Sequence, residues 1–98
     1  MYIVREIFHI QFGKFKEAKA LIDEGIRKNL LLQPHGTRIL SDFTGPGYRL
    51  IIELPYATLG EYERDLKKEL AGNAWNDWYE QFKALMRYSE REILKQLI

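Results

Sequence analysis

Cysteine is missing from all 98 residues of the chain. Its absence excludes disulfide bonds, thiol nucleophiles and thiolate ligands to a metal ion, and it is compatible with a reducing compartment. Long apolar runs are missing as well: segments such as Leu30–Leu32 and Leu50–Ile52 are only three residues long. A bilayer needs about 20 such residues in a helix, so we expect no membrane span and no membrane partner.

An excess of charge of either sign is also lacking, because the formal net charge at pH 7 is +1. A nucleic-acid or membrane-surface partner requires a basic patch, so the charge argues against both. The N-terminal segment MYIVREIF contains a glutamate where a signal peptide is apolar, which predicts a cytoplasmic protein. The composition, 46% hydrophobic and 30% charged, is typical of one soluble globular domain covering residues 1–98.

The most strand-like segment is Tyr48–Pro55, YRLIIELP, which follows a turn signal at Thr44–Gly47 and ends in proline. Its period of two places apolar side chains on one face and a mixture of isoleucine and charge on the other. We expect the apolar face to pack against helices. The mixed face is too apolar for open water and too polar for an ordinary core, so its covering is the main question for function. The mixed face consists of Arg49, Ile51 and Glu53.

Alternation also predicts a central strand over Tyr2–Ile10, because apolar residues occur on both of its faces. The period changes to that of a helix from Phe15 to about Asn29. Thr37–Phe43 then reads as a strand that forms a β-hairpin, over residues 37–54, with the strand described above.

A second helical region follows the hairpin. Thr58 and Glu61 have the spacing of a capping box, which predicts a helix start. Gly72 is expected to end this helix in the left-handed conformation, and Asn73 to cap a second helix with a wide aromatic face. The buried stripe of the first helix is predicted to contain Leu59, Tyr62, Leu66 and Leu70.

The last segment, Tyr88–Ile98, fits two structures. It continues the aromatic helix, or Ser89 ends that helix and Arg91–Ile98 forms a final strand. The strand completes the element order β-α-β-β-α-β, the ferredoxin-like order, and few other folds use it. We therefore predict an α+β fold with an antiparallel sheet and helices on one face.

Several short motifs resemble one superfamily. They are the VREIF strand that leads to Gly13-Lys14, the helix start at Leu59–Glu63, and the tryptophan-containing helix followed by Arg91–Leu94. With the element order, they resemble the dimeric α+β barrel superfamily, which includes NIPSNAP-like and antibiotic-biosynthesis-monooxygenase-like (ABM-like) proteins. The resemblance implies a homodimer in which two sheets pack face to face, dimerising into an eight-stranded α+β barrel that covers the mixed face.

The resemblance does not imply one activity. Similar proteins include cofactor-independent monooxygenases, haem binders and isomerases, so the fold alone does not decide function. No catalytic motif of an active subfamily matches the chain, and no catalytic residue is assigned. His9 and His35 are the only histidines and have no metal-ligand spacing, so we expect no metal and no cofactor.

Two candidate ligand-binding residues lie on the first strand. Arg5 and His9 share one face, and a neutral imidazole beside Arg5 is suited to act as a base or to bind a ligand. The alternative is a histidine at the surface end of a strand. If the strand is turned over, Glu6 points into the barrel and His9 packs under the helices.

The other candidates are Arg49, Glu53 and Trp78. Glu53 is a candidate general base if it is buried, or the partner of Arg49 or of a charge on the next strand. Trp78 belongs to a helical cluster that forms either an aromatic wall for a flat ligand or ordinary core. The cluster consists of Trp75, Trp78, Tyr79 and Phe82.

These features favour a homodimer that binds a small, flat ligand between sheet and helices or inside the barrel, with oxygenase- or isomerase-like chemistry that needs no cofactor. The alternative is a non-catalytic structural or interaction module whose barrel interior is simply packed. RNA binding in the manner of an RRM is disfavoured, because Tyr48 has no aromatic partner at the required spacing. An amino-acid-sensing, ACT-like module shares the element order and stays open.

Overall fold

The computed structural model describes residues 1–98 and contains four strands and three helices in the order β-α-β-β-α-α-β. The strands are β1 (Tyr2–Ile10), β2 (Arg38–Ser41), β3 (Arg49–Tyr56) and β4 (Met86–Lys95). The helices are α1 (Phe15–Arg27), α2 (Leu59–Leu70) and α3 (Asn73–Lys83).

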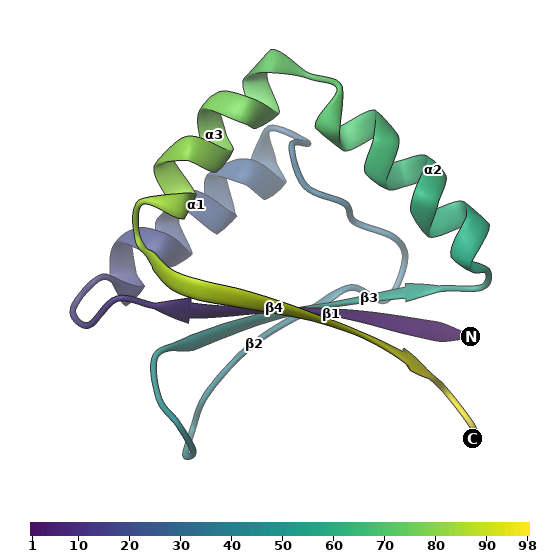
Figure 1. Cartoon of the computed structure of the whole chain (residues 1–98), viewed down its shortest axis with the longest axis horizontal. Coiled ribbons are helices and arrows are strands. Elements are labelled where there is room, and N and C mark those ends of the chain that lie inside the picture. Colours follow the sequence, from purple (N-terminus) through teal and green to yellow (C-terminus); the bar gives the residue numbers. More distant parts are fainter.

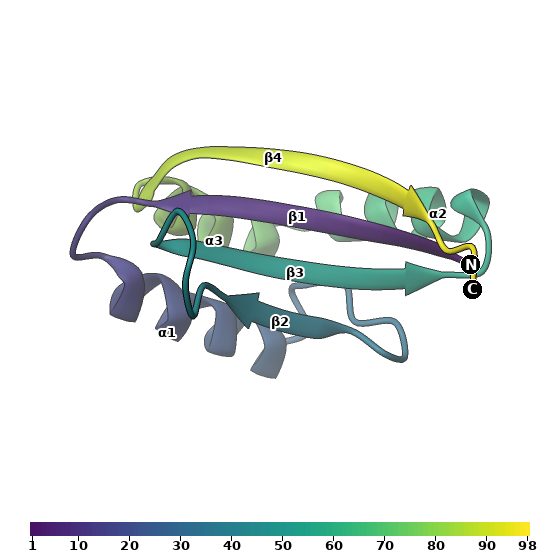
Figure 2. The ribbon, with the colours of Figure 1, turned by 90° about the horizontal axis from the view of Figure 1, so that it is seen from below.

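The four strands form one antiparallel sheet in the order β2-β3-β1-β4. β1 is central, as its two apolar faces predicted, and Figure 2 shows the sheet with the helices behind it. The ferredoxin-like α+β fold is therefore confirmed. The hairpin of β2 and β3 is also confirmed, and the strand alternative for the C-terminal segment is correct.

All three helices lie on one face of the sheet. α2 and α3 meet at an angle and form a roof over it, and α1 lies beside α3 (Figure 1). The core fills the space between these layers. Its fully buried members come from both strands and helices: Val4, Ile10, Ile22, Leu50 and Phe82. No helix is long and apolar enough to cross a membrane.

α1 packs closely against the third helix at a glycine. A Cβ atom at Gly25 would lie 3.2 Å from the indole of Trp78 and 3.0 Å from the side chain of Leu31. The indole nitrogen of Trp78 also donates a hydrogen bond of 2.6 Å to the carbonyl of Leu21 in α1. This contact holds α1 against α3 and positions one end of the roof.

The corner between α2 and α3 differs from the prediction. Thr58 caps α2 by accepting from the amide of Glu61 at 3.2 Å, as predicted. Gly72, however, is extended (φ −97°, ψ 140°) and is itself the N-cap of α3, so Asn73 is the first helical residue. The C-cap of α2, Ala71, has right-handed geometry, and the chain then turns through one extended residue without a left-handed one.

The predicted buried stripe of α2 is only partly correct. Tyr62 is buried, but Leu59 and Leu70 remain 44% and 51% exposed. α2 slopes across the end of the sheet rather than lying flat on it (Figure 1), so its two ends do not reach the core. A cavity lined by α2, α3 and the sheet lies beneath this roof, and it is the candidate site.

The strand boundaries also need correction. β2 covers Arg38–Ser41 and is shorter than the predicted 37–43. β3 continues through Pro55 to Tyr56, because β2 pairs only as far as Glu53 and no neighbour on that side requires an amide from Pro55. β4 begins at Met86, so Ser89 lies inside the strand.

Candidate functional site

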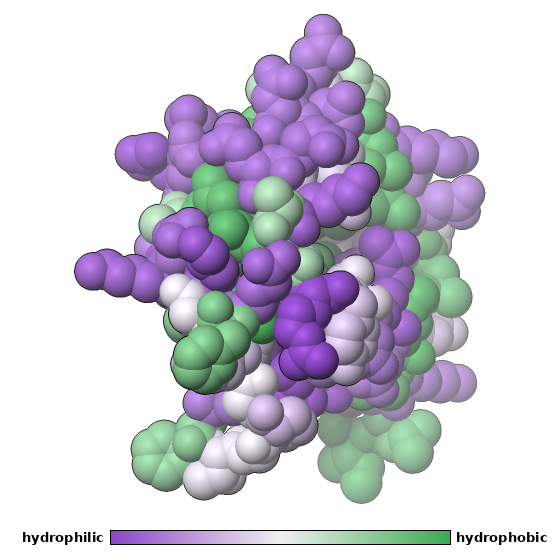
Figure 3. Space-filling model, turned by 60° about the vertical axis from the view of Figure 1, so that its left-hand side comes forward, coloured by the Kyte–Doolittle hydropathy of each residue, from purple (hydrophilic) through white to green (hydrophobic).

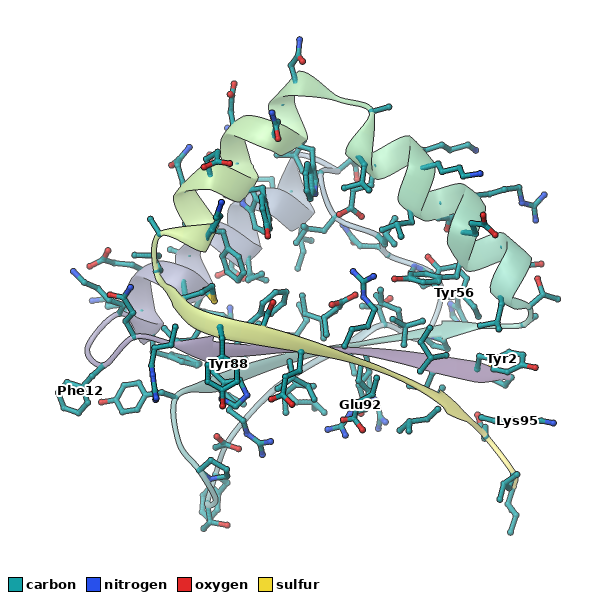
Figure 4. All side chains as sticks on the ribbon, viewed as in Figure 1. Tyr2, Phe12, Tyr56, Tyr88, Glu92 and Lys95 are labelled. Carbon is teal, nitrogen blue, oxygen red and sulfur yellow. The ribbon has the colours of Figure 1, made fainter.

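The five predicted site residues fall on opposite sides of the sheet. Arg5, His9, Arg49 and Glu53 lie on the side away from the helices, whereas Trp78 lies in the core on the helix side. We call the side away from the helices the open face. Figure 4 shows Tyr88 and Glu92 on this side and Tyr56 on the other. The strand register adds Ile3, Ile7, Arg38, Leu40, Ile51, Tyr88, Glu90 and Glu92 to the open face.

A row of alternating charges crosses all four strands of the open face. Its members are paired by register in the order Arg38, Glu53, Arg5 and Glu92. The nitrogen–oxygen distances along this charged row are 2.5, 3.2 and 3.3 Å. Because Glu53 contacts two guanidinium groups, its carboxylate is committed to structure and is poorly placed to act as a general base.

His9 and Arg49 have partners other than those predicted. The His9 Nε2 atom lies 2.7 Å from a carboxylate oxygen of Glu90, and the ring stacks on Tyr88 at 4.0 Å between centroids. Its neighbour is therefore a carboxylate rather than the guanidinium of Arg5. Arg49 donates to Asp42 in the hairpin turn at 2.8 Å, and this hydrogen bond lowers the pKa of the Asp42 carboxyl.

The central isoleucines of the open face are already covered within one chain. Ile7 and Ile51 are each only 5% exposed, because the paired charged side chains fold over them. The burial of these two residues thus requires no partner, and the open face presents a packed, paired surface.

A cavity lies on the opposite side, between the sheet and the roof of α2 and α3. Its volume is about 330 Å³, and eleven of its fifteen lining residues are hydrophobic. We call it the helix–sheet cleft. Its floor includes Phe8 and Leu54 of the sheet. Its walls include all four members of the predicted aromatic cluster: Trp75, Trp78, Tyr79 and Phe82.

Stacking fixes the aromatic wall. Trp75 stacks on Tyr79 with 4.8 Å between ring centroids, and Trp78 stacks on Phe82 with 4.9 Å. Phe82 also meets Phe8 of β1 edge to face at 4.9 Å. These contacts hold flat apolar surfaces toward the helix–sheet cleft, an arrangement that suits a planar guest.

An ion pair lies on the sheet side of the cleft. Glu6 of β1 and Arg91 of β4 are register partners, and Arg91 Nε donates to Glu6 at 2.5 Å. Burial raises the pKa of Glu6, and Arg91 offsets part of this effect. Arg91 also lies 5.9 Å from the centre of the Tyr62 ring.

A second carboxylate in the cleft has no cationic partner. Glu69, on α2, accepts a hydrogen bond from the backbone amide of Leu32 at 3.1 Å but forms no salt bridge. Burial is the main cause that raises the pKa of Glu69 to about 7, with a smaller contribution in the same direction from Glu6. The indole of Trp75, the Leu32 amide and the Arg91 charge act in the opposite direction. Glu69 can therefore gain or lose a proton near neutral pH.

Two hydrogen-bond donors beside this group are buried without partners. They are the hydroxyl of Tyr62 and the indole nitrogen of Trp75, neither of which makes a hydrogen bond of good geometry. Burial raises the pKa of the Tyr62 hydroxyl. Unpaired buried donors are rare in folded proteins and are concentrated at functional sites.

Sequence reasoning missed Glu6, Tyr62, Glu69 and Arg91 as site residues. One signal was visible: Glu6 is a charge on the otherwise apolar face of the first strand, and such a residue needs a partner. Its partner Arg91 could not be predicted, because the predicted strand began at Arg91, five residues after the true start of β4 at Met86. No group of three or more histidine, aspartate or glutamate side chains is arranged to hold a metal ion.

Comparison with solved structures defines the class of the fold. A NIPSNAP family protein from Agrobacterium tumefaciens superposes with a TM-score of 0.84 at 23% identity, covering 97% of this chain and 84% of that chain. A NIPSNAP-like domain protein from Burkholderia xenovorans gives 0.87 at 17% identity, covering 98% and 84%. A putative antibiotic biosynthesis monooxygenase from Nitrosomonas europaea gives 0.71 at 16% identity and covers both chains fully.

The structural neighbours are thus NIPSNAP and ABM-like proteins, as the sequence resemblance predicted. No protein-family model and no curated protein matches the chain. At such low identities the likeness establishes the fold alone, so the function has to be argued from the helix–sheet cleft itself.

Proposed function

We propose that the protein binds a small, largely apolar ligand with an aromatic ring in the helix–sheet cleft. The observation that carries this proposal is a cavity of binding-site size whose aromatic walls converge on a few polar groups. The stacked rings of Trp75 and Tyr79 support it, because they present flat apolar surfaces to the cavity.

The chemistry that we propose for this cleft is proton transfer, as in an isomerase or an oxygenase that needs no cofactor. Glu69 is the candidate acid or base, since a pKa of about 7 suits transfer in both directions at neutral pH. One structural neighbour is a putative antibiotic biosynthesis monooxygenase, which supports this class of chemistry. The open-face residues Arg5, His9, Arg49 and Glu53 are not part of this proposal, because each is already paired within the sheet.

We also propose that two copies pair through their open faces, as in an α+β barrel. Four apolar side chains stand almost free in the single chain, and three of them belong to the hairpin tip and the C-terminus: Phe43, Leu97 and Ile98, with Phe12 as the fourth. The hairpin tip and the C-terminus both extend from the sheet on the side away from the helices (Figure 1), and apolar groups project at that lower edge in Figure 3. Apolar residues around a paired polar face fit the margin of a contact between copies.

The ligand proposal is tested by titrating naphthalene into the purified protein by calorimetry. Ser89 lines the cleft from the edge strand β4 and is exposed, so Ser89→Trp fills the cavity without disturbing the core. We expect naphthalene to bind the wild type and to fail with Ser89→Trp. Ser41→Trp on β2, away from the cleft, should bind normally.

A wild type that does not bind naphthalene contradicts the ligand proposal and leaves the alternative, a structural module without a ligand. Native mass spectrometry of the purified protein adds a direct observation. A co-purified small molecule that is lost from Ser89→Trp but kept by Ser41→Trp would support the cleft as the binding site.

A further inference from the structure

We propose that the ligand of the helix–sheet cleft is an amine, a flat apolar body with an ammonium group that pairs with Glu69. This inference rests on the proposed function, because it specifies the charge of the ligand in the same cavity. Two observations carry it: the charge balance of the cleft and the aromatic surfaces beside Glu69.

The charged groups of the cleft leave one anion without a counterion. Glu6 is neutralised by Arg91 at 2.5 Å, so this pair contributes no net charge. Glu69 shares the same cavity and makes no ion pair, and its one backbone hydrogen bond, from Leu32, does not neutralise a carboxylate. A buried carboxylate is stabilised most by a cation that it can both pair with and hydrogen-bond. The chain itself provides none, so the cation would have to come from the ligand.

Aromatic rings line the same cavity as Glu69. Trp75 and Glu69 both line the cavity. The ring of Tyr79 stacks on the indole of Trp75 with an interplanar angle of 9°. Trp and Tyr faces attract ammonium groups through their ring quadrupoles, with Trp the strongest. A neutral apolar ligand would use the walls but leave Glu69 unpaired, and an anionic ligand would be repelled by it.

Other titratable groups near Glu69 leave its role unchanged. Tyr56 donates a hydrogen bond of 2.9 Å to Asp65, so those two groups satisfy each other. The ring of Tyr62 lies 5.9 Å from the Arg91 guanidinium, and Tyr62 stays protonated because burial raises its pKa. Lys68 lines a second pocket, which lies between α2 and the 29–34 loop and shares Glu69 with the cleft. Lys68 is exposed and forms no ion pair with Glu69. Ionisation of Glu69 is therefore the event that prepares the cleft for a cation.

The experiment compares three probes that share a naphthalene body. They are 2-naphthylmethylamine, which is a cation, 2-naphthol, which is a neutral donor, and naphthalene itself. Affinities are measured by calorimetry at pH 8, where Glu69 is mostly ionised, and again at pH 6. The variants are Glu69→Gln and, as the matched control, Glu63→Gln on the exposed side of the same helix.

We expect the amine to bind the wild type about tenfold or more tightly than naphthalene at pH 8, because a hydrogen bond to a charged group is worth at least this factor. The advantage should shrink at pH 6, disappear in Glu69→Gln and persist in Glu63→Gln. Gln has nearly the size of Glu and replaces one carboxylate oxygen with an uncharged NH2 group, so the variant removes the charge and keeps the shape of the cavity.

Each of the other outcomes overturns the inference in a distinguishable way. If naphthalene and the amine bind equally, the cleft binds apolar ligands without selecting charge, and only the amine assignment fails. If 2-naphthol binds as tightly as the amine, the cleft selects a hydrogen-bond donor and not a positive charge. If Glu69→Gln keeps the preference for the amine, another group selects it. If no probe binds, the proposed function fails as well.

Discussion

Glu69 shows how one side chain can set the pH response of a fold. Burial raises its pKa from 4.5 to about 7, so the folded chain holds a proton that the unfolded chain has already released between these values. The favourable contribution is therefore fully present below about pH 4.5 and is lost as the pH rises through about 7. Above that pH the folded protein contains an unpaired, half-buried anion.

Glu69→Gln should consequently stabilise the protein at high pH. We expect the free energy of unfolding to increase by about 1–2 kcal/mol at pH 8 and to change little at pH 4; the figure is reduced for partial solvent screening of this site. Urea unfolding at both pH values provides the measurement. Glu63→Gln, which alters an exposed pair with Lys67, should change stability by less than about 0.5 kcal/mol at either pH.

Arg91 provides the second prediction at this scale. Arg91→Ala removes the partner of Glu6, whose side chain is 17% exposed, and we expect a loss of about 1–3 kcal/mol at pH 7. Because burial already raises the pKa of Glu6, loss of Arg91 raises it further, and the destabilisation should fade toward pH 4. Thermal unfolding against pH measures both effects.

A double variant tests the explanation. Glu6→Gln combined with Arg91→Met removes both charges and should recover most of the stability, since no charge remains uncompensated. If the double variant is as unstable as Arg91→Ala, the arginine acts through its packing on Tyr62 and not through the ion pair.

The grouping of residues on each strand face was predictable from the sequence, but the side of the sheet that the faces of the first strand take was left open, and the partners of the charged residues were not predictable. A period of two correctly groups Arg5 with His9 and Arg49 with Glu53, and the structure places all four on the open face. Pairing depends on lateral register, which the order of residues along one strand does not contain. Arg49 therefore takes Asp42 from the turn, a contact that no strand pattern reveals.

At the scale of the helix, replacement of glycine by alanine should change stability in opposite directions at two positions, Gly25 and Gly60. Gly25→Ala in α1 would place a methyl group 3.0 Å from Leu31 and 3.2 Å from Trp78. Overpacking costs about 1–3 kcal/mol of stability, and replacing glycine by alanine in a helix adds about 1 kcal/mol. We therefore expect the free energy of unfolding to fall by about 1 kcal/mol. Gly60→Ala in α2 meets nothing closer than Thr58 Oγ1 at 4.0 Å and should stabilise by up to about 1 kcal/mol.

Chemical denaturation of both variants decides the point. A Gly25→Ala protein that is as stable as the wild type would mean that α1 and the 29–34 loop can move apart. In that case the loop would be too loosely held to define the edge of the helix–sheet cleft.

Element types were more predictable than element ends. Periodicity and turn signals correctly predicted every helix and strand up to α3, because the apolar periods of these elements are separated by clear breaks such as Thr44–Gly47. The start of β4 was not predictable, because its residues after Met86 are all exposed in the single chain and show no apolar alternation. The corner at Gly72 was wrong because a glycine after a helix is compatible with both a left-handed and an extended conformation.

At the scale of the whole molecule, Phe43 is the most direct test of the proposed pairing of open faces. Its side chain is fully exposed in the single chain, so Phe43→Ser should leave the folding of one chain unchanged. If two copies meet through their open faces, we expect their dissociation constant to increase about tenfold or more on loss of this buried ring. Native mass spectrometry and analytical ultracentrifugation at micromolar concentration provide the measurement.

Leu59→Ser is the matched control, because Leu59 is a partly exposed apolar residue on the helix side of the sheet. It should leave the association unchanged. A wild type that stays monomeric at these concentrations would contradict the pairing, and the charged row would then be a solvent-facing surface in its own right.

The charged row across the open face also has a direction. It starts with a cation, Arg38 on β2, and ends with an anion, Glu92 on β4. Placing β4 of one molecule beside β2 of the next would continue the alternation, and such a head-to-tail contact does not close. The four-residue β2 offers few free backbone groups against the ten-residue β4, so this contact gains little. We therefore expect the shortness of β2 to disfavour the growth of this self-complementary sheet into filaments.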